Sequence, residues 1–219
     1  VIDLDPQGNA TSILAAEEPT ATAADLLSNP TLANLHNSLT PCAWEVAPGE
    51  VDVIASSPEL IQHDAFKSAA AFKPRLARAL EKLDGYDLVL IDCPPSLGLI
   101  TINAFAAATD ILVPMQCEFY ALEGLTQLQR IVTLVQKNLN PSLKISKVVL
   151  TMYDPRTTLT LEVAKEVERV FPNEICKTRI PRTVRLAEAP SFGQPITVFD
   201  PTSKGATAYV ELAKEILNG

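Results

Sequence analysis

The chain has 219 residues, 47% of them hydrophobic, and a formal net charge of −8. This length favours one α/β domain with an ample core, and no apolar run reaches the about 18 uncharged residues that a membrane span needs. The acidic balance argues against a protein that coats itself in nucleic acid, and four cysteines without CxxC spacing, with only two histidines, argue against a zinc site.

Strand and helix signals alternate from the first residue. In the first half they predict the following elements: a strand ending at Asp3 to Asp5, an alanine-rich helical stretch to about Leu27, an irregular excursion over 31–50 around a short helix, a strand at Val51–Ala55, helical residues from Ser57 to Leu83 divided at Pro74, and a buried parallel strand at Tyr86–Asp92.

The second half continues the alternation. We expect helices at 96–108, Ala121–Leu139, Thr157–Phe171 and Ser203–Leu217, strands at Asp110–Pro114, Ile145–Leu150 and Ile175–Ile180, and a short extended piece at Ile196–Phe199. The helix at 157–171 should bury Leu161, Ala164, Val167 and Phe171, and the last helix should bury Ala206, Tyr209, Val210, Ala213 and Leu217. The pattern predicts one domain, 1–219, with a mostly parallel twisted sheet covered by helices on both faces.

Two of the predicted strands end in acids. Asp3 and Asp5 share a strand face, and Asp92 is followed by Cys-Pro-Pro-Ser, whose prolines restrict the backbone directly after the acid. Acids at strand ends also cap turns, so each alone is weak evidence. Together they can bring three carboxylates to the carboxyl edge of a sheet, a geometry that suits magnesium and a polyphosphate.

Several sequence blocks, in order, resemble the ParA (Soj) family of chromosome- and plasmid-partitioning ATPases, which have a P-loop NTPase-type fold with a deviant P-loop. The blocks are Asp3-Leu-Asp-Pro-Gln-Gly-Asn9, Ile91-Asp-Cys-Pro-Pro-Ser-Leu97, Val113-Pro114 with Tyr120-Ala-Leu-Glu-Gly124, Thr151-Met-Tyr-Asp-Pro-Arg156, Ile180-Pro-Arg-Thr-Val-Arg-Leu-Ala-Glu-Ala-Pro-Ser191 and Gly205-Ala-Thr-Ala-Tyr-Val-Glu-Leu-Ala-Lys214.

The resemblance implies an ATPase that uses ATP and Mg²⁺. Asp5 matches the acid that positions the hydrolytic water, and Asp3 belongs to the same block near magnesium and the γ-phosphate. Asp92 matches the Walker B acid, which holds magnesium through water. Pro181 corresponds to a turn that approaches the adenine.

The resemblance also implies an ATP-bound homodimer that binds double-stranded DNA without sequence preference, through arginines matching Arg156 and Arg185. Arg182 and Lys204 add positive charge to 144–219, where 11 Lys and Arg face 9 Asp and Glu, although solvated surface charge is the alternative interpretation. A ParB-like partner would stimulate hydrolysis. We expect a cytoplasmic, nucleoid-associated protein without membrane attachment, because Ala206–Leu217 is not a basic amphipathic helix.

One feature departs from the family. No G-x-x-x-x-G-K-S/T loop occurs in the chain, which begins with Val inside an expected strand. We therefore expect an upstream segment carrying the lysine loop and a central strand, and expect residues 1–219 alone to fold poorly or to bind no ATP. A related ATPase that positions a division site or another cargo, and a non-catalytic DNA-binding scaffold that has lost its P-loop, remain the alternatives.

Overall fold

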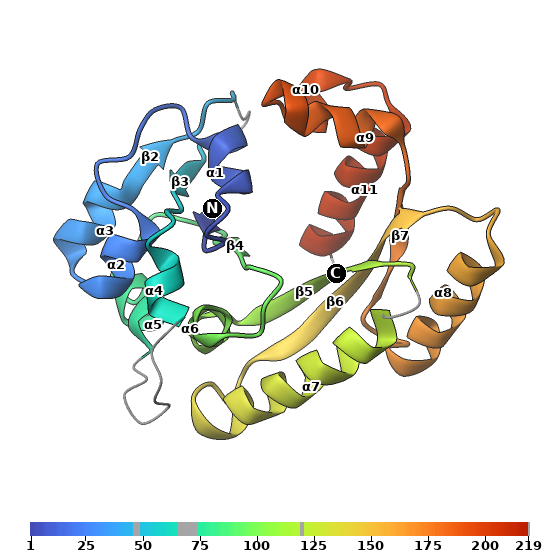
Figure 1. Cartoon of the computed structure of the whole chain (residues 1–219), viewed down its shortest axis with the longest axis horizontal. Coiled ribbons are helices and arrows are strands. Elements are labelled where there is room, and N and C mark those ends of the chain that lie inside the picture. Colours follow the sequence, from blue (N-terminus) through green and yellow to red (C-terminus); the bar gives the residue numbers. More distant parts are fainter. Residues whose placement is uncertain (46–48, 65–73, 119–120, 219) are drawn as a thin grey trace. The chain divides into compact units, whose positions relative to one another are not determined.

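The computed structural model describes residues 1–45, 49–64, 74–118 and 121–218 and divides the chain into two compact units (Figure 1). Unit 1 comprises 1–109 and 131–143, and unit 2 comprises 110–130 and 144–219. The expected α/β class with mostly parallel strands is confirmed, but the strands form two sheets rather than one. The expectation of a single domain stays a prediction.

Unit 1 contains a four-stranded sheet in the order β2-β3-β1-β4. Strand β1 pairs in parallel with both β3 and β4, whereas β2 pairs antiparallel with β3. Strand β2 lies in the stretch that we expected to be irregular. The strands are β1 (Ile2–Asp3), β2 (Leu39–Pro41), β3 (Asp52–Ile54) and β4 (Ile91–Asp92).

Short helices cover this sheet. They are α1 (Asn9–Leu14), α2 (Ala23–Ser28), α3 (Leu32–Ser38), α4 (Leu60–Asp64), α5 (Arg75–Leu80) and α6 (Leu99–Ala107). The alanine-rich stretch therefore forms two helices, and a capping box between Thr22 and Asp25 begins the second one. Helix α5 begins directly after Pro74, while residues 65–73 of the expected helical segment lie outside the described residues. Apolar side chains of α2 to α6 pack on Ile2, Leu4 and Ile54.

The expected buried strand at Tyr86–Asp92 is the main correction in unit 1. Only Ile91–Asp92 is a strand, and the side chains of Leu88 and Leu90 are 56% and 53% exposed. Among the described residues of unit 1, β4 is an edge strand that pairs only with β1. Val89 and Ile91 pack on the core, whereas Leu88 and Leu90 lie on the side that no part of the core covers. A continuous apolar run was therefore a poor guide to two-sided burial here.

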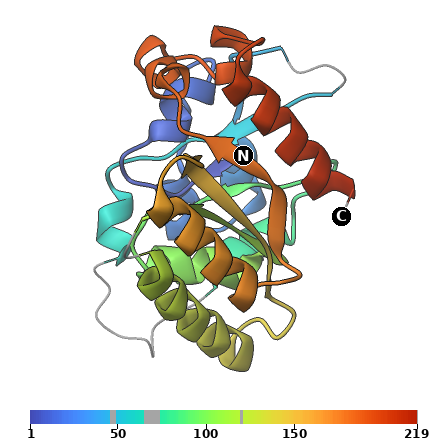
Figure 2. The same ribbon diagram turned by 90° about the vertical axis from the view of Figure 1, so that its right-hand side faces the viewer.

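Unit 2 contains a parallel three-stranded sheet in the order β5-β6-β7. The strands are β5 (Asp110–Gln116), β6 (Lys144–Tyr153) and β7 (Ile175–Pro181). Helix α7 (Ala121–Asn138), which contributes residues to both units, and α8 (Thr158–Val170) pack on one face, and α11 (Lys204–Asn218) packs on the other (Figures 1 and 2). This unit has the expected helices on both faces of a sheet.

The last segment differs from expectation at its start. Residues between β7 and α11 form α9 (Val184–Glu188), the 3₁₀ helix η2 (Ala189–Phe192) and α10 (Ile196–Phe199). Ile196–Phe199 is therefore helical rather than extended. Pro195 precedes its first turn, where the missing amide of proline costs no intrahelical hydrogen bond.

Two predicted helix faces are also wrong in part. In α8, Leu161 is 42% exposed, and Thr160 is buried, with its hydroxyl hydrogen-bonded to that of Thr157. In α11, Ala206 is buried as expected, but Tyr209, Val210, Ala213 and Leu217 are exposed. The face that packs contains Ala206 together with Gly205, Ala208, Leu212 and Ile216.

Candidate nucleotide and nucleic-acid sites

The carboxyl ends of β1 and β4 bring acids together in unit 1. Asp3 and Asp92 are register partners on adjacent parallel strands, and the amide of Leu4 donates to the carbonyl of Asp92 at 2.8 Å. Asp5 follows in the turn after β1. The structure thus places the three predicted acids at one edge of the sheet, where α/β proteins bind ligands.

The charges and the burial at this edge shift the pKa of Asp92. Desolvation, together with the negative charges of Asp3 and Asp5, raises the pKa of Asp92 above its ordinary value. Part of the side chain reaches solvent, so this carboxylate is accessible to a ligand while its charge is disfavoured. A bound cation would relieve that cost.

These residues fit a magnesium ion that is shared with a nucleotide. Mg²⁺ usually takes one or two protein carboxylates and completes its octahedron with water and phosphate oxygens. Asp92 supplies an accessible oxygen donor of this kind. Across the described ranges, no group of three or more His, Cys, Asp or Glu is arranged to hold a metal by itself.

Asp3 has a different environment from Asp92. Its side chain is fully buried, and its two oxygens accept hydrogen bonds from the amide of Asp5 at 3.0 Å and from the amide and hydroxyl of Thr11 at 2.8 and 2.7 Å. Three donors compensate the burial of a carboxylate. Asp3 thereby joins the end of β1 to the start of α1, and its place next to magnesium stays a prediction.

The turn that carries Asp5 is held from a second side. The hydroxyl of Ser56, just after β3, donates to the carbonyl of Asp5, and the amide of Ser56 donates to the Thr11 hydroxyl at 2.8 Å. Gly8, at φ 65°, provides the left-handed residue that turns the chain into α1. Sequence reasoning assigned no role to Thr11 or Ser56, because their contact spans 45 residues.

In unit 2, predicted DNA-binding residues follow the ends of β6 and β7. Tyr153 and Pro181 are register partners, and the amide of Arg182 donates to the carbonyl of Tyr153 at 3.2 Å. Arg156 therefore lies in the loop after one strand, and Arg182 directly follows the adjacent strand. Pro181, the predicted adenine contact, is half-buried at the end of β7.

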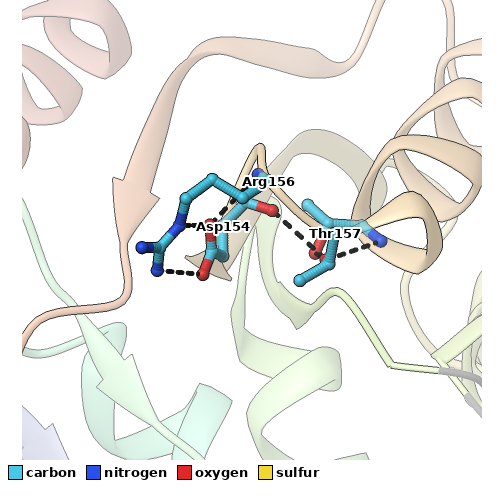
Figure 3. Close-up of polar contacts among 4 residues, drawn as sticks. Asp154, Arg156 and Thr157 are labelled. Atoms are coloured by element: carbon cyan, nitrogen blue, oxygen red, sulfur yellow. Dashed lines mark hydrogen bonds and ion pairs between the residues drawn. The ribbon is translucent and has the colours of Figure 1, made fainter.

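Arg156 is exposed but paired. Its side chain is 85% exposed, and its Nε and Nη2 donate to the two oxygens of Asp154 at 2.8 and 2.7 Å (Figure 3). The side-chain and backbone hydrogen bonds from Arg156, with a contribution from the charge of Arg182, lower the pKa of Asp154 to about 2. Thr157, beside this pair, caps α8 by accepting from the amide of Thr160.

Arg185 is paired as well. It contacts Glu188 at 3.2 Å and Asp200 at 3.3 Å, and its guanidinium lies 5.6 Å from the ring centre of Phe199. Lys204 begins α11 next to Gly205, which faces Leu186 of α9. We call Arg156, Arg182, Arg185 and Lys204 the basic edge of unit 2; all four are exposed.

Arg179, which also lies in the basic C-terminal third, is not part of this edge. Its side chain is only 23% exposed, pairs with Glu168 at 2.9 Å and lies 6.0 Å from the ring centre of Tyr153. These contacts assign the Arg179 side chain to packing within unit 2 and not to the basic edge. Within the described residues, the structure contains no helix long and apolar enough to cross a membrane.

Comparisons with known proteins cover nearly the whole chain. A family model described as an AAA domain matches residues 1–145. The sporulation initiation inhibitor protein Soj of Bacillus subtilis (strain 168) is 43% identical over 229 residues, covering 99% of this chain and 85% of that protein. The chromosome partitioning protein ParA of Myxococcus xanthus is 40% identical over 222 residues, covering 99% and 76%.

A solved structure is similar over the same span. The cobyrinic acid a,c-diamide synthase of Mycobacterium smegmatis, crystallised with an ATP analogue and magnesium, is 32% identical with a TM-score of 0.77. The similarity covers 99% of this chain and 80% of that one. The matched span therefore includes both the acidic edge of unit 1 and the basic edge of unit 2.

Proposed function

Because the chain belongs to the ParA/Soj family of chromosome-partitioning ATPases, we propose that it hydrolyses ATP to drive the segregation of DNA. The observation that carries this proposal is the register of Asp3 with Asp92, which brings Asp5 and Asp92 to one carboxyl edge. The similar synthase structure, which holds an ATP analogue and magnesium, supports the same chemistry.

Each acid of this edge has its own task. Asp92 would hold magnesium through a water molecule; burial and the charges of Asp3 and Asp5 raise its pKa, and a bound cation would favour its ionised form. Magnesium, when bound, supplies charge neutralisation on the β- and γ-phosphates. Asp5 accepts a hydrogen bond from the attacking water and orients it in line with the bond to the leaving ADP, so that ATP and water give ADP and phosphate.

The basic edge of unit 2 would contact DNA. Guanidinium and ammonium groups bind phosphate oxygens without reading bases, which gives salt-dependent and sequence-independent affinity. In this proposal ATP closes a homodimer that presents Arg156 and Arg185 to double-stranded DNA, with Arg182 and Lys204 beside them. A ParB-like partner stimulates hydrolysis and releases the complex, which acts on the nucleoid in the cytoplasm.

We also propose Pro181 as a contact for the adenine base. Its ring is half-buried at the end of β7, and the neighbouring Tyr153 is its register partner. An apolar ring at such a strand end can pack against the face of a purine. This contact affects nucleotide affinity rather than the chemical step.

The test measures ATP hydrolysis by the native polypeptide with and without nonspecific double-stranded DNA, and an Asp5→Ala variant runs alongside. We expect slow turnover that is lost in the variant, while ATP-dependent DNA binding persists. Turnover without any DNA binding would favour an ATPase that positions another cargo. No turnover in either protein, with DNA binding indifferent to ATP, would refute the ATPase and favour a scaffold.

A further inference from the structure

We infer that Asp3, Thr11 and Ser56 are positioning residues that fix the direction of the Asp5 carboxylate. This inference rests on the proposed role of Asp5 in orienting water. It assigns Asp3 a task inside the protein, in addition to its predicted nearness to magnesium. It also adds two residues to the site for which the sequence offered no role.

The contacts form a closed ring around the Asp5 backbone. The amide of Asp5 donates to Oδ1 of Asp3 at 3.0 Å, and the carbonyl of Asp5 accepts from the hydroxyl of Ser56. Ser56 in turn donates its amide to the hydroxyl of Thr11 at 2.8 Å, and that hydroxyl donates to Oδ2 of Asp3 at 2.7 Å. The ring therefore holds both peptide groups of Asp5 from three segments: the end of β1, the start of α1 and the second residue after β3 (Figure 1).

The Asp5 side chain is restrained at its far end too. Its Oδ1 accepts a hydrogen bond from the amide of Gln7 at 3.0 Å. The backbone is held on both sides and Oδ1 is engaged, and within the part of the chain that the structure describes no residue donates to the second oxygen, Oδ2, which is left to meet a water. Rotation of the carboxylate would cost the Gln7 hydrogen bond, so the direction of Oδ2 is set before any substrate arrives.

One member of the ring, Asp3, is buried, whereas Asp5, Thr11 and Ser56 are half-buried. Asp3 is fully buried, so each of its hydrogen bonds is shielded from competing water, and loss of a donor would leave a buried charge undercompensated. A shift of about 1 Å in a catalytic group can lower a rate by about 100-fold. Thr11 and Ser56 therefore act on the chemical step through Asp5 and not through nucleotide contacts of their own.

Three variants of the native polypeptide test the inference: Thr11→Val, Thr11→Ser and Ser56→Ala. The readouts are kcat and KM for ATP hydrolysis, the affinity for a fluorescent ATP analogue with magnesium, and the melting temperature. We expect Thr11→Val and Ser56→Ala to lower kcat by about 10- to 100-fold with KM changed less than about threefold. Thr11→Ser keeps the hydroxyl and should retain kcat within about twofold.

Thr160→Val is the matched control. Like Thr11, Thr160 is a threonine whose hydroxyl bonds to another side chain, that of Thr157 in unit 2, although Thr160 is buried (4% exposed) and Thr11 is half-buried. This control should lose stability but keep kcat. If Thr11→Val does not fold, Ser56→Ala and Thr11→Ser still test the inference, because they change the ring less than Thr11→Val does.

The outcomes separate this inference from the proposed function. If the wild type hydrolyses no ATP, the proposed function fails and the inference falls with it. If wild type and Asp5→Ala behave as proposed while Ser56→Ala keeps full kcat, the proposed function stands and the positioning inference is overturned. Equal losses of kcat in Thr11→Ser and Thr11→Val, or losses that follow nucleotide affinity, would also overturn it.

Discussion

The Asp154 carboxylate binds the guanidinium of Arg156 with the two-point geometry that a DNA phosphate would use. Two parallel hydrogen bonds engage Nε and Nη2 of Arg156, the atoms best placed for a bidentate phosphate contact. We predict that Asp154→Asn raises the affinity for nonspecific DNA. Asparagine keeps an oxygen that can accept from the Arg156 amide, as Asp154 does at 3.1 Å, so the turn persists, while the negative charge and the oxygen that accepts from Nη2 are removed.

The size of the effect follows from the distance between charges. A DNA phosphate bound to Arg156 would lie about 6 Å from the Asp154 carboxylate. At that distance in water, removing the repulsion between phosphate and carboxylate raises the affinity for DNA about threefold. Screening at about 0.1 M salt reduces this factor to about twofold per phosphate contacted. If Arg156 meets DNA only in the variant, the plot of log affinity against log salt should also steepen by up to about 0.9.

The assay is fluorescence anisotropy of labelled nonspecific duplex DNA at several salt concentrations, with ATP and magnesium present. Glu166→Gln is the control, because it breaks another exposed pair, with Arg169 at 2.5 Å, near the far end of α8. Arg156→Ala in the Asp154→Asn background should abolish the gain. An unchanged affinity in Asp154→Asn, or an equal gain in Glu166→Gln, would refute the reasoning.

The pH dependence of this effect has a definite sign. The folded pKa of Asp154, about 2, lies below its ordinary value of 3.8, so the pair contributes stability above the ordinary value and loses it as pH falls towards 2. Asp154 stays ionised between pH 6 and 8. The gain in DNA affinity should therefore be the same at both values.

Three further predictions concern packing and titration. A methyl group on Gly205 would lie 2.7 to 3.0 Å from three atoms of Leu186, so Gly205→Ala should lower the free energy of unfolding by about 1–3 kcal/mol. Gly124→Ala, with open space in α7, should raise it by about 0.5–1 kcal/mol, and denaturant unfolding that ranks the two variants the other way would contradict this account. Because the folded pKa of Asp92 is raised, the ionised carboxylate lowers stability at pH values above its ordinary pKa. Asp92→Asn should therefore melt at a higher temperature than wild type at pH 7 but not below about pH 4, and it should lose magnesium-dependent hydrolysis. A lower melting temperature of the variant at pH 7 would contradict this prediction. Burial and the charge of Asp92 raise the pKa of Cys93 to about 12, so iodoacetamide should label Cys93 at pH 8 only after unfolding, and rapid labelling of the native protein, followed by mass spectrometry, would disprove this.

Of the candidate site, the acidic edge could be predicted best from the sequence. Strands that end in Asp3 and Asp92 have their acids at the same edge whenever they pair in parallel, because parallel strands point the same way. The ring behind Asp5 was not predictable in this way. Ser56 and Thr11 are 45 residues apart, and hydroxyls are common at strand and helix ends, so only the fold shows that they meet.

Helix α11 shows why periodicity identified the wrong face. The helix carries two apolar stripes, and spacing alone does not tell which one packs. Gly205 determines which stripe packs, because its missing side chain lets Leu186 approach closely and places Ala206 and Leu212 on the packed side. The competing stripe with Tyr209 and Leu217 is left exposed. Total hydrophobicity therefore matters less here than the one position where two elements can touch.

The exposed flank of β4 has a consequence for the colloidal behaviour of the protein. Leu88 and Leu90 present apolar side chains along a sheet edge, the arrangement that invites another chain to add a strand. Exposed Asp84 and Asp87 stand just before them and repel a second copy of the same acidic segment. Because salt screens such repulsion within about 10 Å at 0.1 M, concentrated stocks of residues 1–219 without an upstream segment should stay monodisperse at low ionic strength and cloud as salt is added.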